Sequence, residues 1–270
     1  MIHLITQFYK VKYKNTSKDL LRKRQNEITY CFKKNLAHKA VKKIHFLYES
    51  EDDVNFLEKE GIDIVSSDKI ILYNLGSRIK YSDIFEYANK NLKNEICVYL
   101  HADMCLDTGF NLLNKESYNS NKVYALTSHN PNRCNRQIIC RCTRQYQTPK
   151  GWYCVTFDGF VFKAPIKNEV IKKANHIVHI MGAENRMIDI FKENNYEVVS
   201  PNNILMAFHH HNIKIFAKKH SYWINREGEL KSLDFYSKIH SRQSNLPYEK
   251  KIVGGGIPFY NGSAEIVDKL

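Results

Sequence analysis

The sequence predicts an α/β fold in which a mixed, mostly parallel sheet is flanked by helices. Two observations indicate this class. Over residues 2–100, short apolar runs alternate with segments of helical periodicity, which is the pattern of successive βαβ units. The run ICVYL (96–100) is apolar at every position, as expected for a central strand buried on both faces. A chain of 270 residues is long enough to bury one large core of this kind.

The first half of the chain supplies the predicted elements in order. IHLITQFY (2–9) is apolar and β-branched, which predicts the first strand. Thr16 or Ser17 can then cap a long amphipathic helix that runs past Leu36, with its lysines and arginines facing outward. The next predicted elements are strands over 43–49, 69–74 and 96–100, alternating with helices over 51–61 and 82–92.

Beyond residue 120 the alternation loosens. A basic run over 130–151 has no periodicity, and we expect no regular structure there. We expect a main domain over residues 1–219 and a C-terminal extension over 220–270 that packs on it. The predicted elements in this half are strands over 122–129, 152–165, 196–201 and 203–211, and helices over 166–175 and 184–195.

The charge balance is strongly basic. Lysine and arginine number 41 against 28 acidic residues, which gives a formal net charge of +13 and attracts anions such as nucleic acid, a membrane surface or phosphorylated small molecules. A nucleic-acid-binding protein would gather its basic residues on one face, whereas here they are spread along the whole chain. We therefore expect no nucleic-acid partner.

The sequence gives three expectations about the cellular setting. No apolar run is long enough for a transmembrane segment, and the first apolar stretch is too short and too early for a secretory signal. We expect a cytoplasmic protein, in the host cytoplasm if the source is viral, since the lysine- and asparagine-rich usage suits a large DNA virus or an AT-rich microbe. The seven cysteines show no paired framework, and the spacing of Cys134, Cys140 and Cys142 is not typical of zinc sites, so reduced thiols are expected.

Polar side chains follow the predicted central strand at the point where it ends. EICVYLHADMCLD (95–107) places His101, Asp103 and Asp107 there. In open parallel sheets, ligands bind beyond the carboxyl ends of the strands. Because divalent cations such as Mg²⁺ and Mn²⁺ prefer carboxylate oxygens and phosphates, Asp103 can hold a cation that also clamps a diphosphate. The alternative is that Asp103 caps a turn and His101 packs locally.

Three later segments carry further candidate residues. In MAFHHHN (206–212), strand alternation puts His209 and His211 on one side, which suits metal binding, although the run can also be an exposed group that titrates near neutrality. GAENR (182–186) places Glu184 at a helix start, where the dipole favours any carboxylate and where it can also act as a base or bind sugar hydroxyls. In FDG (157–159), Asp158 can bind substrate or belong to a turn, and Gly159 indicates a close backbone approach.

Over residues 2–216 these segments together resemble a GT-A glycosyltransferase. HLITQFY, RQNEITYCFKKNL and KIHFLYE are similar to the nucleotide-binding start of small GT-A enzymes. SRIKYSDIFEYANKNLKNEICVYLHADM resembles their stretch of Arg, Tyr, helix and strand that ends in a DxD motif. DGFVFKAP, GAENRMIDIFKENNYEVVSP and FHHHN resemble the acceptor strand, the acidic helix start and the late metal-binding histidine. Two motifs depart from the pattern: His101 replaces the first acid of DxD, and Asn185 follows Glu184 where many inverting enzymes have Asp.

The resemblance implies a GT-A (Rossmann-like) fold and a glycosyltransferase activity. Such an enzyme would move a sugar from a nucleotide-diphosphate sugar, most often UDP-linked, to a hydroxyl of a glycan or protein acceptor, with Mn²⁺ or Mg²⁺ bound. If the enzyme inverts, a carboxylate must take the acceptor proton, and the resemblance favours Glu184 first and Asp158 second. Asp158 otherwise grips donor or acceptor hydroxyls, and a retaining enzyme would need no base there.

The resemblance also implies roles at the donor. It gives Asp103 and His211, with His209 as a further candidate, as ligands of the cation. The residues that it places around the nucleotide are Thr6, Gln7 and Phe8 at the base, Arg78 and Tyr81 near the nucleotide or its phosphates, and His101 and Asp103 at the nucleotide sugar or the cation.

Two other functions remain open from the sequence. A sugar nucleotidyltransferase would carry a glycine-rich phosphate loop near its first strand, and ITQFYKVKYK (5–14) contains no glycine. A basic nucleic-acid-binding protein without catalytic activity leaves the acidic strand end unexplained, because carboxylates without a cation repel phosphate. The sugar, the acceptor and the oligomeric state are not predicted.

Overall fold

The computed structural model describes most of residues 1–211 and two short parts of the segment that follows. The described residues are 1–12, 16–64, 66–129, 145–148, 151–154, 157–180, 182–199, 201, 204–211, 222–224 and 230–232. Most of the predicted extension (220–270) and the first part of the basic run (130–144) lie outside them, and so does the CxxxxxCxC cluster.

A nine-stranded sheet runs through this part of the chain. Its strands are β1 (Ile2–Thr6), β2 (Val41–Tyr48), β3 (Ile70–Asn74), β4 (Ile96–Leu100), β5 (Met104–Leu106), β6 (Lys122–His129), β9 (Phe157–Lys163), β10 (Glu197–Val199) and β11 (Ala207–His209). Their order is β3-β2-β1-β4-β9-β6-β11-β5, with β10 paired to β6. The sheet is mixed and mostly parallel, because antiparallel pairing is limited to β9 with β4 and β6 and to β5 with β11. The predicted fold class is confirmed.

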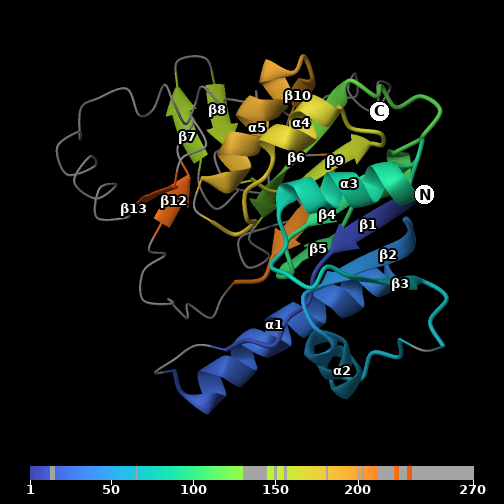
Figure 1. The fold of residues 1–270 in the computed structure, drawn as a ribbon, viewed down its shortest axis with the longest axis vertical. Coiled ribbons are helices and arrows are strands. Elements are labelled where there is room, and N and C mark those ends of the chain that lie inside the picture. Colours follow the sequence, from blue (N-terminus) through green and yellow to red (C-terminus); the bar gives the residue numbers. More distant parts are fainter. Residues whose placement is uncertain are drawn as a thin grey trace.

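Helices cover the sheet in two layers (Figure 1). The helices are α1 (Lys18–Ala37), α2 (Glu51–Lys59), α3 (Tyr81–Asn91), α4 (Asn168–Lys173) and α5 (Ala183–Glu193). Crossovers between parallel strands are right-handed, so β1-α1-β2 and β2-α2-β3 place α1 and α2 on one face, whereas β3-α3-β4 returns across the sheet and places α3 on the other. Helices α4 and α5 pack with α3 in this second layer.

Each layer meets the sheet through aromatic side chains. On the α1 face, the Phe32 ring lies 5.8 Å from that of Phe8 and 6.1 Å from that of Phe46, measured between centroids. On the α3 face, Phe85 contacts Phe162 at 5.2 Å. Strand β4 is buried at all five positions between the two layers, as its continuous apolar run predicts.

The helix starts follow local capping chemistry. Of the two caps proposed for α1, Ser17 is the one used, and its hydroxyl accepts the N–H of Leu20 at 3.3 Å. At α2, the Asp53 carboxylate accepts the N–H of Ser50 at 3.3 Å, and Gly61 follows the helix with a left-handed φ of 78°.

Three short features depart from the sequence prediction. Strand β5 and the 3-10 turn η1 (Phe110–Leu112) follow the central strand, where only a site was predicted. Strand β7 (Gln145–Thr148) lies in the basic run expected to lack regular structure, and it pairs with β8 (Gly151–Cys154), which covers the start of the strand predicted over 152–165. The tyrosine and threonine of β7 favour a strand once a partner is present, which local periodicity does not reveal. Strands β12 (Tyr222–Ile224) and β13 (Leu230–Ser232) form a second hairpin.

Among the described helices, none is long and apolar enough to cross a membrane.

Candidate active site

The candidate site lies where the strand order reverses. Strand β1 pairs with β2 on one side and with β4 on the other, and the connections leave toward opposite faces of the sheet. A crevice opens at such a point, beyond the carboxyl ends of the strands. The Thr6 hydroxyl donates to Leu100 O at 3.0 Å and so joins the ends of β1 and β4. Residues that directly follow these two strands therefore meet at one place.

A tight turn after β4 fixes His101 and Asp103. The N–H of His101 donates to Asp158 O at 3.2 Å, and the N–H of Met104 donates to His101 O at 3.0 Å. Both His101 and Asp103 are buried. Asp103 therefore does lie in a turn, as the alternative interpretation predicted. Its carboxylate, however, faces other charged groups.

The histidine run reaches Asp103 through strand pairing. Strand β11 runs antiparallel to β5 with His209 opposite Met104, and the N–H of His210 donates to Asp103 O at 2.9 Å. Asp103 Oδ2 lies 2.9 Å from His209 Nε2 and 3.5 Å from His211 Nδ1. The three side chains offer ligand atoms within 4.8 Å of one another. His209 and His211 therefore share one side, as the alternation predicts, whereas their role as ligands remains a prediction.

Arg24 joins this group, and the sequence analysis missed it. The basic residues of the first helix were expected to face outward, but Arg24 on α1 is only 4% exposed. Its guanidinium forms an ion pair with Asp103 Oδ2 and hydrogen bonds to Glu27 Oε2 (2.8 Å) and His210 O (2.7 Å). Arg24, His209 and His211 all approach Oδ2.

The electrostatics of this group favour charged forms. Burial lowers the pKa of His209, but the charge and hydrogen bond of Asp103 outweigh burial and raise this pKa to about 9. Burial raises the pKa of Asp103, but His209, His211 and Arg24 outweigh it and hold this pKa well below its usual range. At neutral pH the carboxylate is therefore ionised and His209 carries a proton.

A second group contains His101, Asp158 and Glu184, which also offer ligand atoms within 4.8 Å of one another. His101 Nε2 lies 3.3 Å from Glu184 Oε1, and His101 Nδ1 lies 3.8 Å from Asp158 Oδ1. The first contact is an ion-pair distance without hydrogen-bond alignment, so the buried Nε2 has no hydrogen-bond partner among the described residues. Burial lowers the pKa of His101, but the close contact with Glu184 and the charges of Asp158 and Asp103 outweigh it and raise this pKa.

Local backbone geometry places the carboxylates of Glu184 and Asp158 beside His101. Helix α5 begins directly after Gly182, which has a left-handed φ of 86°. Glu184 lies in the first turn of this helix. Asp158 lies in β9, where a Cβ on Gly159 would stand 2.5 Å from Tyr99 O. Only glycine allows β9 to approach β4 so closely, which confirms the predicted close approach.

Neighbouring hydroxyls hold the same carboxylates. Tyr81 OH donates to Glu184 Oε1 at 3.4 Å, and Ser128 Oγ donates to Asp158 Oδ2. Burial and the charge of Glu184 raise the pKa of Tyr81 well above its usual value, so Tyr81 remains a donor. The role that the resemblance gave Tyr81, near the nucleotide or its phosphates, remains a prediction; its hydroxyl lies at Glu184.

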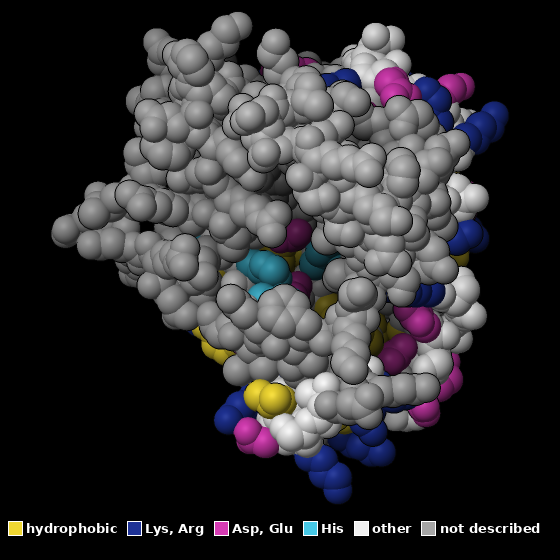
Figure 2. Space-filling view, turned by 90° about the vertical axis from the view of Figure 1, so that its left-hand side faces the viewer, with side chains coloured by type: hydrophobic (Ala, Val, Ile, Leu, Met, Phe, Trp, Pro, Cys, Tyr) yellow, Lys and Arg dark blue, Asp and Glu magenta, His cyan; other side chains and the backbone are white. Residues whose placement is uncertain are grey.

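The two groups form one continuous cluster, since His209 Nδ1 lies 3.7 Å from Asp158 Oδ2. Figure 2 shows histidine and acidic side chains next to one another in this view of the molecule. We call these six residues the strand-end cluster: His101, Asp103, Asp158, Glu184, His209 and His211. The structure therefore brings together the predicted catalytic and metal-binding residues, which lie up to 110 positions apart in the chain.

The residues expected at the nucleotide base have varied surroundings. The hydroxyl of Thr6 is used by Leu100 O, and Gln7 Nε2 contacts His179 Nε2. Phe8 is 1% exposed and packs in the aromatic core on α1, whereas Arg78 is exposed between β3 and α3. Their roles at a nucleotide remain predictions, and for Phe8 such a role would require a change in the core.

His179 is a further site residue that the sequence analysis did not identify. Its ring lies 4.1 Å from that of His101, and its backbone has a left-handed φ of 63°. Such a conformation is unfavourable for a residue other than glycine and is concentrated at functional sites. Burial and the charge effect of His101 lower the pKa of His179 well below its usual value, so His179 is neutral at neutral pH.

Comparison with known proteins found no matching family model and no matching curated protein. Among solved structures, a mannosyltransferase from Pyrobaculum calidifontis in complex with GDP-Man and Mn²⁺ has a TM-score of 0.44 and 10% identity, covering 95% of this chain and 68% of its own. A 4-diphosphocytidyl-2C-methyl-D-erythritol synthase has a TM-score of 0.39 and 8% identity, covering 76% and 92%. A structure assigned as a glucose-1-phosphate thymidylyltransferase from Bacillus anthracis has a TM-score of 0.40 and 14% identity, covering 76% and 88%. Similarities at this level do not define a family, and the function is inferred from the geometry of the site.

Proposed function

We propose that the protein is a GT-A-type glycosyltransferase. It moves a sugar from a nucleotide-diphosphate sugar, with UDP as the first candidate nucleotide, to a hydroxyl of a glycan or protein acceptor. The observation that supports this proposal is the strand-end cluster, which joins a group suited to a divalent cation with a group suited to proton transfer. Both lie at the point of the sheet where ligands of α/β proteins bind.

The donor end of the site is Asp103 with His209 and His211. One carboxylate oxygen and two imidazole nitrogens within 4.8 Å are a donor set that Mn²⁺ accepts, and Mg²⁺ is the alternative. A bound cation would neutralise charge that develops on the departing diphosphate. Arg24 adds a permanent positive charge beside Asp103. It also competes for Oδ2, so a cation would use Oδ1 or displace the guanidinium.

The acceptor end of the site is Glu184 with His101, Asp158 and Tyr81. An inverting transfer needs a base for the acceptor proton, and Glu184 Oε1 lies beside Tyr81 OH and His101 Nε2. His101 balances the negative charges of Glu184 and Asp158. Asp158, held by Ser128, is positioned to bind sugar hydroxyls or to replace Glu184 as base.

Nucleotidyl transfer is the main alternative chemistry. Such enzymes hold a triphosphate on a glycine-rich loop, and this chain has no glycine before Gly61, so none follows β1. Binding of nucleic acid is disfavoured at the strand-end cluster itself, because its three carboxylates would repel phosphates in the absence of a cation.

The decisive experiment measures thermal stability with a panel of nucleoside diphosphates and Mn²⁺. We expect one diphosphate to raise the Tm only when Mn²⁺ is present, and Asp103→Asn to abolish this shift. Asp107→Asn is the matched control, since Asp107 lies four positions later outside the cluster. Release of pyrophosphate from a nucleoside triphosphate and a sugar phosphate would instead support nucleotidyl transfer. Stabilisation by DNA and by no nucleotide would contradict both enzymatic functions.

A further inference from the structure

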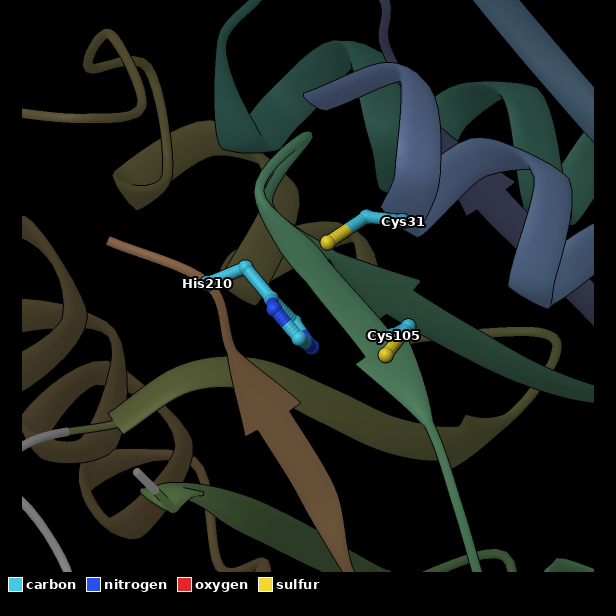
Figure 3. A group of neighbouring side chains, drawn as sticks. All are labelled: Cys31, Cys105 and His210. Atoms are coloured by element: carbon cyan, nitrogen blue, oxygen red, sulfur yellow. The ribbon is translucent and has the colours of Figure 1, made fainter. Parts of the chain in front are cut away.

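A third group of side chains lies beside the strand-end cluster but is not part of it. Cys31 on α1, Cys105 on β5 and His210 after β11 offer two sulfur atoms and an imidazole nitrogen within 4.8 Å of one another. Figure 3 shows the two thiols and the ring directed toward a common space between these elements. We call these residues the thiol cluster.

The strand register explains why this cluster forms. In the β5–β11 ladder, Cys105 lies opposite Phe208, so His210, two positions farther on, faces the same side of the sheet as Cys105. Helix α1 packs against β5 on this side and brings in Cys31. His209 and His211 face the other side, toward Asp103. One three-residue run thus serves two separate clusters.

We propose that Cys31, Cys105 and His210 bind a zinc ion. Two thiolates and one imidazole are a zinc-binding set, and Zn²⁺ takes four ligands in tetrahedral geometry, so water or an added ligand would complete the site. The donor set differs from that of Asp103, His209 and His211, because thiolates select soft and borderline metals over Mn²⁺ or Mg²⁺. The three ligands come from elements that are distant in the sequence. A metal bound to them would therefore hold these elements together and stabilise the folded state.

Zinc at this cluster would position the strand-end cluster. It would tie α1, which carries Arg24, to the segment that carries His209 and His211. His210 already joins the two sites through its backbone, because its N–H donates to Asp103 O and its carbonyl accepts from Arg24. The zinc site does not depend on the proposed glycosyl transfer, since any ligand of the strand-end cluster would use the same support.

The test uses the full chain, purified with a reductant, freed of metal and titrated with Co²⁺ as a spectroscopic substitute for Zn²⁺. Thiolate ligands give an intense near-ultraviolet charge-transfer band, which carboxylate and imidazole ligands do not. We expect a band at one Co²⁺ per chain that Zn²⁺ abolishes. Cys31→Ser and Cys105→Ser should each reduce it by at least half, whereas the matched control Cys97→Ser, a buried cysteine of β4, should retain it.

Two further variants identify which cysteines give rise to the charge-transfer band. Cysteines 134, 140 and 142 could also supply thiolates, so the triple serine variant at these positions must retain the band. Asp103→Asn must retain it as well, because Asp103 belongs to the other cluster. If the cysteine variants of the thiol cluster fail to fold, His210→Gln replaces them, since His210 is partly exposed, and it should weaken Co²⁺ binding at least tenfold.

Several results would overturn the zinc site. The first is a band that survives in both Cys31→Ser and Cys105→Ser, or in His210→Gln with unchanged affinity. The second is a band that disappears in the serine variant at positions 134, 140 and 142 but not in the variants of the thiol cluster. The third is a protein that binds no Zn²⁺ in the reduced state, or one in which mass spectrometry finds Cys31 and Cys105 joined as a disulfide under the same reductant.

Discussion

Two groups of buried histidines in this molecule have opposite electrostatic character. Between β1, β2 and α3, His3 Nδ1 lies 2.8 Å from His45 Nε2, and His45 Nδ1 lies 2.6 Å from Tyr87 OH. Burial lowers the pKa of both histidines, that of His45 to about 3. In the strand-end cluster, carboxylates raise the pKa of His101 and of His209.

The comparison shows that the hydrogen-bond partner, rather than burial alone, decides the charge of a buried histidine. His45 is bonded to neutral groups and can only be neutral, so it stabilises the sheet as an uncharged link. His209 is bonded to Asp103 and is charged at neutral pH. Of these two arrangements, the second holds opposite charges side by side, at the proposed active site.

The largest effect that would sharpen this comparison is expected from Glu184→Gln. The variant keeps the shape of the side chain but removes the charge opposite His101 and the capacity to accept a proton. Turnover of the donor sugar should fall by about 10²- to 10⁴-fold, which is the usual contribution of a general base. The measurement is nucleoside diphosphate release at saturating donor, with the Tm shift by nucleotide and Mn²⁺ as a check that binding is retained. Unchanged turnover would remove Glu184 from the chemistry.

Arg24→Gln tests the charged cluster through stability. The change removes the buried guanidinium from Asp103 and Glu27, so we expect the free energy of unfolding to fall by about 3 kcal/mol or more. Lys23→Gln is the matched control on the same helix, because its pair with Asp19 is exposed at both side chains, 54% and 69%. Its loss should stay below about 1 kcal/mol. Equal losses in urea unfolding would mean that burial of Arg24 carries no special weight.

Local signals in the sequence indicated the candidate residues of the strand-end cluster, and the resemblance to GT-A enzymes assigned them to one site, in which their roles remain predictions. The continuous apolar run of β4 marks a central strand, and the residue that follows such a strand is known to face the crevice. Alternation in a strand separates His209 and His211 from His210 without any knowledge of the partner strand. Glu184 was visible because Gly182 and a periodic segment mark a helix start.

The residues that were missed depend on contacts between distant segments. Arg24 lies on a helix with many exposed basic residues, and nothing in its neighbourhood distinguishes it from them. Its partner Asp103 is 79 positions away. Strand β5 has only three residues, which is too short for a periodic signal, and His179 owes its place to a left-handed backbone conformation. The order of strands beyond β4 likewise depends on pairing and not on periodicity.

The two histidine groups should give opposite pH dependence of stability. The pKa of His45 in the folded state, about 3, lies below its ordinary value of 6.5, so the unfolded chain binds the proton first as pH falls. Stability contributed by His45 is complete above pH 6.5 and falls by about 1.4 kcal/mol per pH unit below it. The pKa of His209, about 9, lies above 6.5, so its contribution is complete below pH 6.5 and is lost as pH rises to 9.

Urea unfolding as a function of pH, with His45→Gln and His209→Gln, checks both signs. His45→Gln should flatten the acid side of the profile, and His209→Gln should flatten the side between pH 6.5 and 9. Each variant leaves the other side unchanged, because the two groups lie on different parts of the sheet. A variant that flattened the opposite side would break the comparison.

The smallest effect is expected from Tyr87→Phe, which removes one hydroxyl from the neutral group. His45 Nδ1 then loses its partner at 2.6 Å and remains buried, so the free energy of unfolding should fall by about 1–2 kcal/mol. Tyr73→Phe is the matched control, since the Tyr73 ring packs on Tyr87 at 4.6 Å but is only partly buried, and we expect a loss of no more than about 0.5 kcal/mol. Donor turnover should be unchanged in both variants at neutral pH, because neither touches the strand-end cluster. If Tyr87→Phe costs no more than Tyr73→Phe, the hydroxyl does not hold His45, and the neutral group owes its stability to packing alone.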